Sequence, residues 1–368
     1  MKVLMSGGGT GGHIFPAVAI ADEIRRRNPD AEFLFIGANG KMEMEKVPQN
    51  GYKIEGLNIA GFDRGNLLSN FKLPFKLLQS LSKARKIIRD FNPDFAVGTG
   101  GFASGPALFM ASSLGVPTFI QEQNAFAGVT NKILSKRAKA VFTAYPKVDG
   151  FPQEKIHFLG NPIRQNIVND LIDRDLAKEK LGLDKAKLTV LSVGGSQGSR
   201  TLNNAWKENL EKLIGKNVQL IWQTGKLDYQ SITRDFEGRN LSEAQRKLVQ
   251  IREFISEMPL AYSAADIIVS RAGAIAISEL AVAQKPVILV PFPNAAEDHQ
   301  TKNALNLVEK NAAKMVRDSE MKEKFWAMLS ELIENEQLRN EMAENIAFFA
   351  KPKAAEEIVN SIYQILKK

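Results

Sequence analysis

The chain has 368 residues, a length that favours two domains, each large enough to bury a core of its own. It has no cysteine, which excludes disulfides and thiolate chemistry, and only three histidines, so a histidine-built metal cluster is not expected. No apolar run approaches the roughly 20 residues of a membrane-spanning helix. The first residues enter a strand without a cleavable signal pattern, so we expect a cytoplasmic protein. The net charge of +8 indicates an anionic partner: phosphates, nucleic acid or a membrane surface.

A glycine-rich segment, residues 6–13, follows the first expected strand, Lys2–Met5. A helix is expected from about Pro16 to Arg27, with Pro16 in its first turn. Gly7, Gly9 and Gly12 match the dinucleotide-binding fingerprint G-x-G-x-x-G, which also needs an acid after the second strand. The second strand, Glu32–Ile36, is followed instead by Gly-Ala-Asn. The segment therefore argues against NAD and predicts a loop that approaches a phosphate closely.

The segment from Phe71 to Arg89 combines apolar and basic residues at helical spacing. An apolar face flanked by cations is how a helix docks on an anionic bilayer. The same pattern is also typical of a helix packed on a sheet with a solvated basic face. Both interpretations stay open on these residues alone.

Two more polar or glycine-rich strand ends follow in the first half. The expected strand Phe95–Gly98 ends in Thr99–Pro106, and a helix runs on to about Leu114. The strand Pro117–Gln121 ends in Gln121–Asn124, and open α/β sheets bind ligands at the carboxyl ends of their strands. This half then closes with a helix and two strands, expected at 128–136, 140–143 and 155–159.

The second half repeats this organisation after a turn at Gly160–Arg164, which we interpret as a hinge. Arg164 suits a diphosphate because its planar guanidinium makes two parallel charge-assisted bonds, although a surface arginine is the alternative. Strands are expected at 189–193, 218–222, 249–251, 266–270 and 286–290. Helices are expected from about 200, near 258–263, at 274–283, near 300, as a pair within 320–349, and at 354–366. The pattern predicts an α/β chain with two doubly wound domains in series, facing a cleft.

The stretch Ser270–Glu279 offers a strand, a glycine turn at Gly273 and a helix start. The first N–H groups of a helix have no partner within it, so they form an anion site. The carboxylate of Glu279 can accept bonds from both hydroxyls of a ribose. The stretch therefore fits a nucleotide, the alternative being a plain crossover with a solvated glutamate.

Six motifs in one order are specific enough to indicate a family. They are Gly8–His13, Thr99–Pro106, Glu122–Asn124, Gly194–Ser199, Ser270–Glu279 and Pro291–Gln300. Together they resemble the MurG family of peptidoglycan synthesis, which transfers N-acetylglucosamine from UDP-N-acetylglucosamine to undecaprenyl-pyrophosphoryl-N-acetylmuramoyl-pentapeptide. The resemblance covers essentially the whole chain and implies a GT-B glycosyltransferase fold of two Rossmann-like domains. It implies that residues 1–161 bind acceptor and membrane and that residues 162–350 bind the UDP-sugar. The C-terminal helix in 351–368 is expected to pack back on the N-terminal domain.

The resemblance also implies site residues. Thr10, Gly11, Gly12 and His13 would face the acceptor pyrophosphate and the reaction centre. The donor contacts would be Asn124 for the sugar, Arg164, Ser196 and Gln197 for the diphosphate, Ile255 for uracil, Ala274, Ile275, Ala276, Ile277, Ser278 and Glu279 for α-phosphate and ribose, and Gln300 for sugar hydroxyls. Some members have two glutamines where this chain has His299–Gln300, so the role of His299 stays open.

The implied reaction is an inverting transfer to the muramoyl hydroxyl of lipid I, giving lipid II for the cell wall. His13 is the expected general base by type and place, the alternative being that it only positions the loop or a phosphate. No cofactor or metal is expected, because helix N-termini and Arg164 can stabilise the leaving diphosphate. The acidic pair Asp173 and Asp175 is interpreted as solvated surface.

The expected partners are UDP-N-acetylglucosamine, the lipid-linked acceptor, an anionic membrane surface and other cell-wall synthesis proteins, without nucleic acid. This places the chain peripherally on the cytoplasmic face of the cell membrane. Two alternatives remain open. One is a UDP-N-acetylglucosamine 2-epimerase of the same fold. The other is a non-catalytic scaffold that binds sugar nucleotides.

Overall fold

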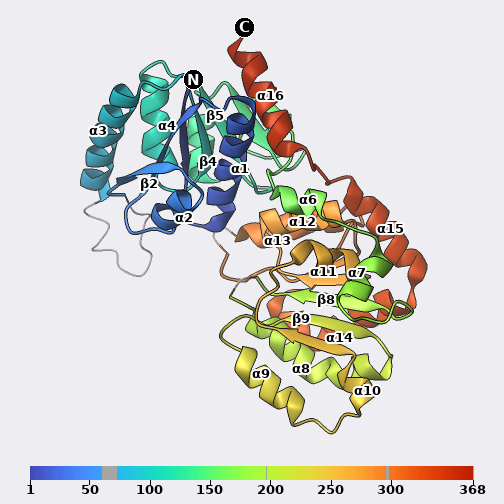
Figure 1. The fold of residues 1–368 in the computed structure, drawn as a ribbon. Coiled ribbons are helices and arrows are strands. Elements are labelled where there is room, and N and C mark those ends of the chain that lie inside the picture. The colour runs from blue at the N-terminus through green and yellow to red at the C-terminus, as the bar shows by residue number, and fades with distance from the viewer. Residues whose placement is uncertain (60–72, 196, 296–297, 368) are drawn as a thin grey trace. The chain divides into compact units, whose positions relative to one another are not determined.

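A computed structural model describes the chain except for residues 60–72, 196, 296–297 and 368. The chain divides into two compact units (Figure 1). The first unit comprises Met1–Arg164 together with Lys351–Lys368, and the second comprises Gln165–Ala350. Among the described residues, no helix is long and apolar enough to cross a membrane.

The described part of the first unit is built on a parallel sheet with the strand order β3-β2-β1-β4-β5-β6-β7. Its strands are β1 Lys2–Gly7, β2 Glu32–Ala38, β3 Lys53–Leu57, β4 Phe95–Gly100, β5 Thr118–Glu122, β6 Ala140–Thr143 and β7 Ile156–Phe158. Its helices are α1 Gly11–Arg27, α2 Glu43–Gln49, α3 Leu73–Phe91, α4 Ser104–Ser113, α5 Val129–Ser135 and α16 Ala354–Leu366, with a short 3-10 turn at Gln153–Lys155.

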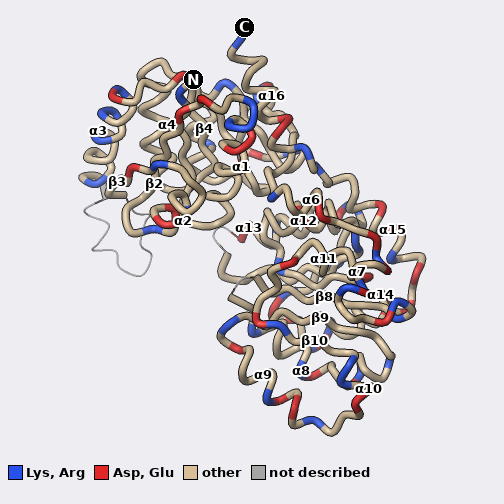
Figure 2. The backbone as a smooth tube through the Cα atoms, viewed as in Figure 1, with Lys and Arg blue, Asp and Glu red and all other residues tan. Residues whose placement is uncertain are grey.

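Alternate side chains along these strands meet helices on opposite faces, because a strand turns successive side chains to opposite sides. Val3, Met5 and Phe35 share a buried cluster with residues of α1 and α16. Gly98 lies on the other face, where an added Cβ would be 2.5 Å from the Leu108 side chain of α4. Helix α3 packs against α4, and Figure 2 shows lysines and arginines along it.

The described part of the second unit contains a parallel sheet with the order β10-β9-β8-β11-β12-β13. Its strands are β8 Thr189–Val193, β9 Gln219–Gln223, β10 Val249–Arg252, β11 Ile267–Ser270, β12 Val287–Leu289 and β13 Lys314–Met315. Its helices are α6 Gln165–Asn169, α7 Arg174–Lys180, α8 Arg200–Gly215, α9 Tyr229–Glu237, α10 Glu243–Arg246, α11 Met258–Ala264, α12 Ala274–Ala283, α13 His299–Val308, α14 Met321–Glu334 and α15 Glu336–Ala347, with a 3-10 turn at Asp318–Glu320.

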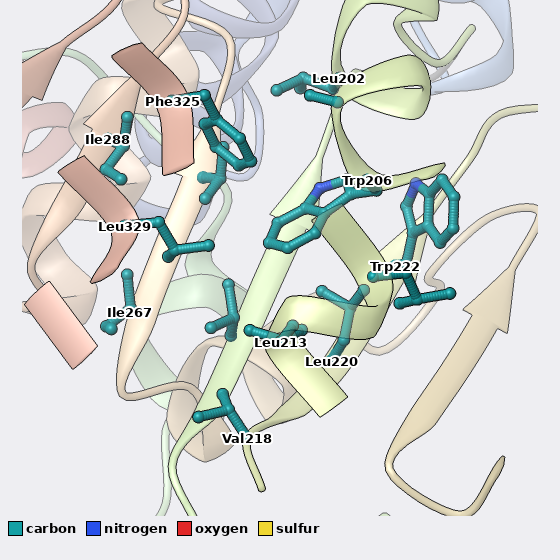
Figure 3. Packing of buried hydrophobic residues seen from close by; sticks show 14 of the residues in the cluster. Leu202, Trp206, Leu213, Val218, Leu220, Trp222, Ile267, Ile288, Phe325 and Leu329 are labelled. Atoms are coloured by element: carbon teal, nitrogen blue, oxygen red, sulfur yellow. The ribbon is translucent and has the colours of Figure 1, made fainter. Parts of the chain in front are cut away.

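The core of the second unit lies between this sheet and helices α8 and α14. Trp206 from α8 and Phe325 from α14 meet edge to face, with ring centroids 5.2 Å apart (Figure 3). The indole N–H of Trp206 donates to the Ser192 hydroxyl at 2.7 Å, so the buried ring leaves no N–H unsatisfied. This packing holds β8 and the loop that follows it in place.

Candidate functional site

The strand order reverses once in each unit, between β1 and β4 in the first and between β8 and β11 in the second. Open parallel α/β sheets bind ligands at such a reversal, beyond the carboxyl ends of the strands. The first reversal carries the segment with His13, and the second carries segments 194–199 and 271–279. The segments at the two reversals therefore lie at the carboxyl edges of the sheets, where sheets of this class bind ligands.

The two glycine-rich loops of the first unit interlock. Gly8 N–H donates to the Gly100 carbonyl at 3.2 Å, and the Thr99 hydroxyl donates to the His13 carbonyl at 2.7 Å. Gly101 has a φ of +90°, and an added Cβ there would be 2.3 Å from the Gly8 carbonyl oxygen. Any larger residue at position 101 would separate the two loops.

Helix α1 begins at Gly11, so the prediction of a start near Pro16 is wrong. Thr10 is the extended N-cap residue, with φ −147° and ψ 158°, and its carbonyl accepts from the N–H groups of His13 and Ile14. Gly11, Gly12 and His13 thus belong to the first turn of the helix. The glycine loop and the helix N-terminus are one element, and Pro16 lies inside the helix.

His13 is half-buried, and its ring has a defined orientation. Nδ1 lies 2.9 Å from the Gly8 carbonyl oxygen and 3.5 Å from the Thr10 hydroxyl. Because a carbonyl oxygen only accepts, Nδ1 of the neutral ring carries the proton and Nε2 presents a lone pair. His13 therefore has the tautomer that a general base acting through Nε2 requires.

Sequence reasoning missed Glu43, a buried acid that reaches the same loop. The dinucleotide fingerprint places its acid directly after the expected strand Glu32–Ile36, at residues 37–39, whereas Glu43 begins helix α2. The side chain is 1% exposed, and its two oxygens accept from Gly9 N–H at 2.8 Å and Ala38 N–H at 3.0 Å. The carboxylate at this edge is thus used by the protein's own backbone, which supports the exclusion of a dinucleotide.

Asn124 lies in the loop after β5 and is held by its neighbour Glu122. Glu122 is 2% exposed, and its Oε1 accepts from the backbone N–H and the side-chain amide of Asn124 at 3.1 and 3.2 Å. Its Oε2 accepts from Gly128 N–H and from the Asn131 amide. Glu122 therefore orders the loop that presents Asn124.

Arg164 is exposed at the end of the first unit.

In the second unit, the loops after β8 and β9 also interlock. Gly198 and Gly225 both have positive φ, and an added Cβ at Gly198 would lie 2.0 Å from the Thr224 carbonyl oxygen. Ser196 lies outside the described residues, and Gln197 is exposed. The helix expected from about residue 200 begins at Arg200, with Ser199 as the N-cap whose hydroxyl accepts from Leu202 N–H.

Helix α12 begins at Ala274, as predicted, after Gly273 in extended conformation. Ile275 and Ala276 are partly exposed, Ile277 is buried, and the Ser278 hydroxyl donates to the Ala274 carbonyl. Glu279 is 6% exposed, and the Tyr262 hydroxyl donates to its Oε2 at 3.3 Å. The alternative of a solvated glutamate is therefore wrong.

Two residues predicted to contact the donor, Ile255 and Gln300, form hydrogen bonds within the protein. Ile255 N–H donates to the Gln223 side chain at 3.0 Å, and Gln223 donates in turn to the Gly195 carbonyl. The Oε1 atom of Gln300 accepts from Phe292 N–H at 2.9 Å, which ties the first turn of α13 to the loop after β12. Ile255 thus lies in the loop after β10, and Gln300 in the first turn of α13 is bonded to the loop after β12.

Sequence reasoning also missed the part played by Arg271. Its guanidinium pairs with Asp318 and donates to the carbonyls of Val290 and Pro291 at 3.1 Å each. Asp318 also accepts from the Thr201 hydroxyl in α8 at 2.6 Å. Arg271 therefore ties the loops after β11 and β12 to the first turn of α8.

The described residues hold no group of three or more His, Cys, Asp and Glu side chains that could bind a metal. Asp173 caps helix α7, accepting from the N–H groups of Asp175 and Leu176. Both Asp173 and Asp175 are exposed, in agreement with the interpretation of this pair as surface.

Both halves of the chain match one protein family. Residues 3–143 match the glycosyltransferase family 28 N-terminal domain, and residues 189–358 match the family 28 C-terminal domain. A Christiangramia forsetii protein is 50% identical over 367 residues, which cover 100% of this chain and 98% of that protein. It is named UDP-N-acetylglucosamine--N-acetylmuramyl-(pentapeptide) pyrophosphoryl-undecaprenol N-acetylglucosamine transferase.

Solved structures give the same assignment. The crystal structure of Acinetobacter baumannii MurG matches with a TM-score of 0.80 at 31% identity, covering 99% of both chains. A UDP-GlcNAc 2-epimerase from Neisseria meningitidis matches with a TM-score of 0.64 at 16% identity, over 99% of this chain and 100% of that one, which shows a common fold alone. The GT-B prediction is confirmed, and the transferase is favoured over the epimerase. The chain belongs to glycosyltransferase family 28 and, within it, to the MurG family.

Proposed function

We propose that this hexosyltransferase moves N-acetylglucosamine from UDP-N-acetylglucosamine to the muramoyl hydroxyl of a lipid-linked, pyrophosphoryl-N-acetylmuramyl pentapeptide, the step that completes lipid II. The observation that carries the proposal is the orientation of His13. Its Nδ1 is committed to the Gly8 carbonyl at 2.9 Å, beside a helix N-terminus that suits a pyrophosphate. A proton acceptor and an anion site next to one another are what a phosphorylated sugar acceptor needs.

The acceptor is assigned to the first unit. Thr10, Gly11 and Gly12 form the first turn of α1, where backbone N–H groups and the positive end of the helix dipole favour an anion. In this assignment they bind the acceptor pyrophosphate, while His13 Nε2 takes the proton of the attacking hydroxyl.

The donor is assigned chiefly to the second unit. The first turn of α12 binds the α-phosphate, and the carboxylate of Glu279 accepts from the ribose hydroxyls. Ile255 contacts uracil through its backbone, with its N–H already oriented by Gln223. Gln300 and Asn124 contact the sugar, and Ser196, Gln197 and Arg164 contact the diphosphate.

The reaction is a single displacement at the anomeric carbon, so an α-linked donor gives a β-linked product. The acceptor oxygen bonds to that carbon as the bond to UDP breaks, and the electron pair leaves with the diphosphate. A retaining route would need a carboxylate nucleophile. The buried acids Glu43 and Glu122 suit no such role, because both oxygens of each accept hydrogen bonds from the protein. The leaving diphosphate is stabilised by the N-terminus of α12 and by Arg164.

Helix α3 is proposed to hold the enzyme at an anionic membrane surface on the cytoplasmic side. The side chains from Pro74 to Gln79 in this helix are exposed, with Phe75 at 82% and Leu78 at 65%. Farther along the same helix, Ala84 and Ile88 are buried. An exposed apolar end on a basic helix favours the membrane interpretation over the core-helix one (Figure 2). Phe71 and Lys72, which began this segment in the sequence, lie outside the described residues.

The cations of α3 divide into two groups. Lys83 donates to the Gly56 carbonyl at 2.8 Å, so it serves to anchor the helix to β3. Lys76, Arg85, Lys86 and Arg89 are exposed and would supply the attraction to acidic headgroups. A membrane-bound machinery of cell-wall synthesis would provide further protein contacts there.

The test is a transfer assay with labelled UDP-N-acetylglucosamine and a short-chain lipid-linked muramyl peptide. The expected product is a β-linked disaccharide. A scaffold would bind UDP without turnover, and an epimerase would convert the sugar nucleotide without any acceptor. Either result would reject the proposal.

A further inference from the structure

Glu43 and His13 bind to opposite sides of one peptide group. The peptide joins Gly8 to Gly9: its N–H donates to Glu43 Oε2 at 2.8 Å, and its carbonyl oxygen lies 2.9 Å from His13 Nδ1. The order of groups is therefore carboxylate, peptide N–H, peptide carbonyl and imidazole N–H. A charge at one end polarises every hydrogen bond of such a chain, because bonds in series strengthen one another in a low-dielectric interior.

The surroundings of Glu43 are built around its carboxylate. The side chain is 1% exposed, and its second oxygen accepts from Ala38 N–H at 3.0 Å. An added Cβ at Gly8 would be 2.2 Å from Glu43 Oε1, and one at Gly37 would be 2.6 Å from Glu43 Cγ. Gly8 and Gly37 thus leave the space that the Glu43 side chain occupies, and a larger residue at either position would clash with it. Two N–H donors facing two oxygens suit the ionised carboxylate, which only accepts.

At the other end of this series of hydrogen bonds, the position of the His13 ring is equally well defined. The ring lies against Gly100, where an added Cβ would be 2.9 Å from Cδ2 and 3.1 Å from Nε2. The Gly8 carbonyl oxygen that accepts from Nδ1 lies close to Gly101, where an added Cβ would be 2.3 Å from it. Neither the ring nor its acceptor can shift without moving the interlocked loops.

We propose that Glu43 is a positioning residue for the transfer reaction, acting through the Gly8–Gly9 peptide to hold His13 in the tautomer protonated at Nδ1. The inference rests on the proposed function, in which His13 Nε2 receives the proton of the acceptor hydroxyl. As that proton arrives, the ring becomes a cation. The polarised Gly8 carbonyl and the Glu43 charge behind it stabilise that cation, as a carboxylate does when it orients a catalytic histidine directly.

A purely structural role for Glu43 makes a different prediction. If the carboxylate only connects the loop to the end of β2 by hydrogen bonds, its loss would lower the free energy of unfolding and leave the tautomer of His13 unchanged. The tautomer of His13 separates the two roles, because it depends on the acceptor at Nδ1.

The first measurement is the ring nitrogen chemical shifts of the full-length protein labelled with ¹⁵N-histidine. The chain has three histidines, so His13→Gln assigns the His13 signals by difference. In the wild type at a pH where the ring is neutral, Nδ1 is expected to be the protonated nitrogen. In Glu43→Gln the shifts should move toward a mixture of tautomers. The matched control is Glu45→Gln, two residues along the same helix, with an exposed carboxylate.

The second measurement is steady-state transfer. Glu43→Gln should lower kcat by about 10- to 100-fold, the range found when a group that orients a metal-binding histidine is lost, with the donor KM unchanged. In the His13→Ala background, Glu43→Gln should cause no further loss, because the two residues act in series.

Several results would overturn the inference. A wild-type His13 protonated at Nε2 would do so without any variant, even if Glu43→Gln fails to fold. So would an unchanged tautomer in Glu43→Gln, or additive losses in the double variant. A tautomer that shifts as expected in a chain that transfers no sugar would reject the proposed function and still support the Glu43–His13 coupling.

Discussion

The hydroxyl of Tyr262 donates a hydrogen bond to the carboxylate of Glu279 at 3.3 Å, and both side chains are buried. The two residues come from α11 and α12, helices that pack together in the second unit. A buried carboxylate needs hydrogen-bond partners, and the phenol of Tyr262 is one of them. This contact orients the carboxylate of Glu279 in the second turn of α12.

Glu279→Ala is expected to raise the donor KM by roughly 10- to 100-fold, since hydrogen bonds to a charged group are worth about 1.5–3 kcal/mol. The acceptor KM should change little, because the acceptor is assigned to the other unit. Tyr262→Phe is the control and should change the donor KM only a few-fold, because the carboxylate remains. The measurement is initial transfer rates at varied concentrations of each substrate. An unchanged donor KM in Glu279→Ala would remove the ribose assignment.

His13→Ala should lower kcat by roughly 10²- to 10⁴-fold, the usual range for the loss of a general base. His157→Gln is the control, because His157 lies in β7, where its ring packs 5.9 Å from that of Phe142. Single-turnover rates with saturating donor and acceptor separate the chemical step from binding. A loss below tenfold in His13→Ala would return this residue to a purely positioning role.

Replacing Phe75 and Lys76 together by glutamate should weaken binding to vesicles with anionic lipid by at least tenfold. A basic residue near such a surface contributes about 1 kcal/mol, and burying a phenylalanine contributes roughly 1.5–3 kcal/mol. The matched control replaces Lys226 and Leu227 by glutamate, since Leu227 is 72% exposed in the second unit. Sedimentation with vesicles measures both, and equal binding by wild type and the Phe75/Lys76 variant would end the membrane proposal.

Gly101→Ala should lower both the free energy of unfolding and kcat. A left-handed conformation costs an alanine about 1–2 kcal/mol. The new Cβ would also lie 2.3 Å from the Gly8 carbonyl oxygen that accepts from His13. Gly115→Ala is the control, because Gly115 has a φ of +84° but no atom within 4 Å of an added Cβ. Urea unfolding should show a larger loss for Gly101→Ala. If both variants lose the same free energy of unfolding and have the same kcat, the two loops accommodate the added Cβ without strain.

Elements that local sequence specifies were predicted closely. The helices Ala274–Ala283 and Ala354–Leu366 and the strand Ala140–Thr143 have the predicted bounds. A glycine turn, helical spacing and a short apolar run each involve only a few neighbouring residues, so they can be recognised from the sequence. The third strand, Lys53–Leu57, was not located, because five residues with a glycine among them carry too little pattern.

The sequence by itself determined the two doubly wound units, the order of the glycine-rich loops and the residue types at the strand ends. Only the tertiary structure decided that α1 begins at Gly11, that Glu43 returns to the loop holding His13, and that Glu279 is buried while Phe75 is exposed. The physical reason is the distance along the chain over which each kind of interaction acts. Backbone propensity and periodicity act between neighbours along the chain. The partner of a carboxylate and the covering of an apolar side chain depend on segments that meet only when the sheet assembles.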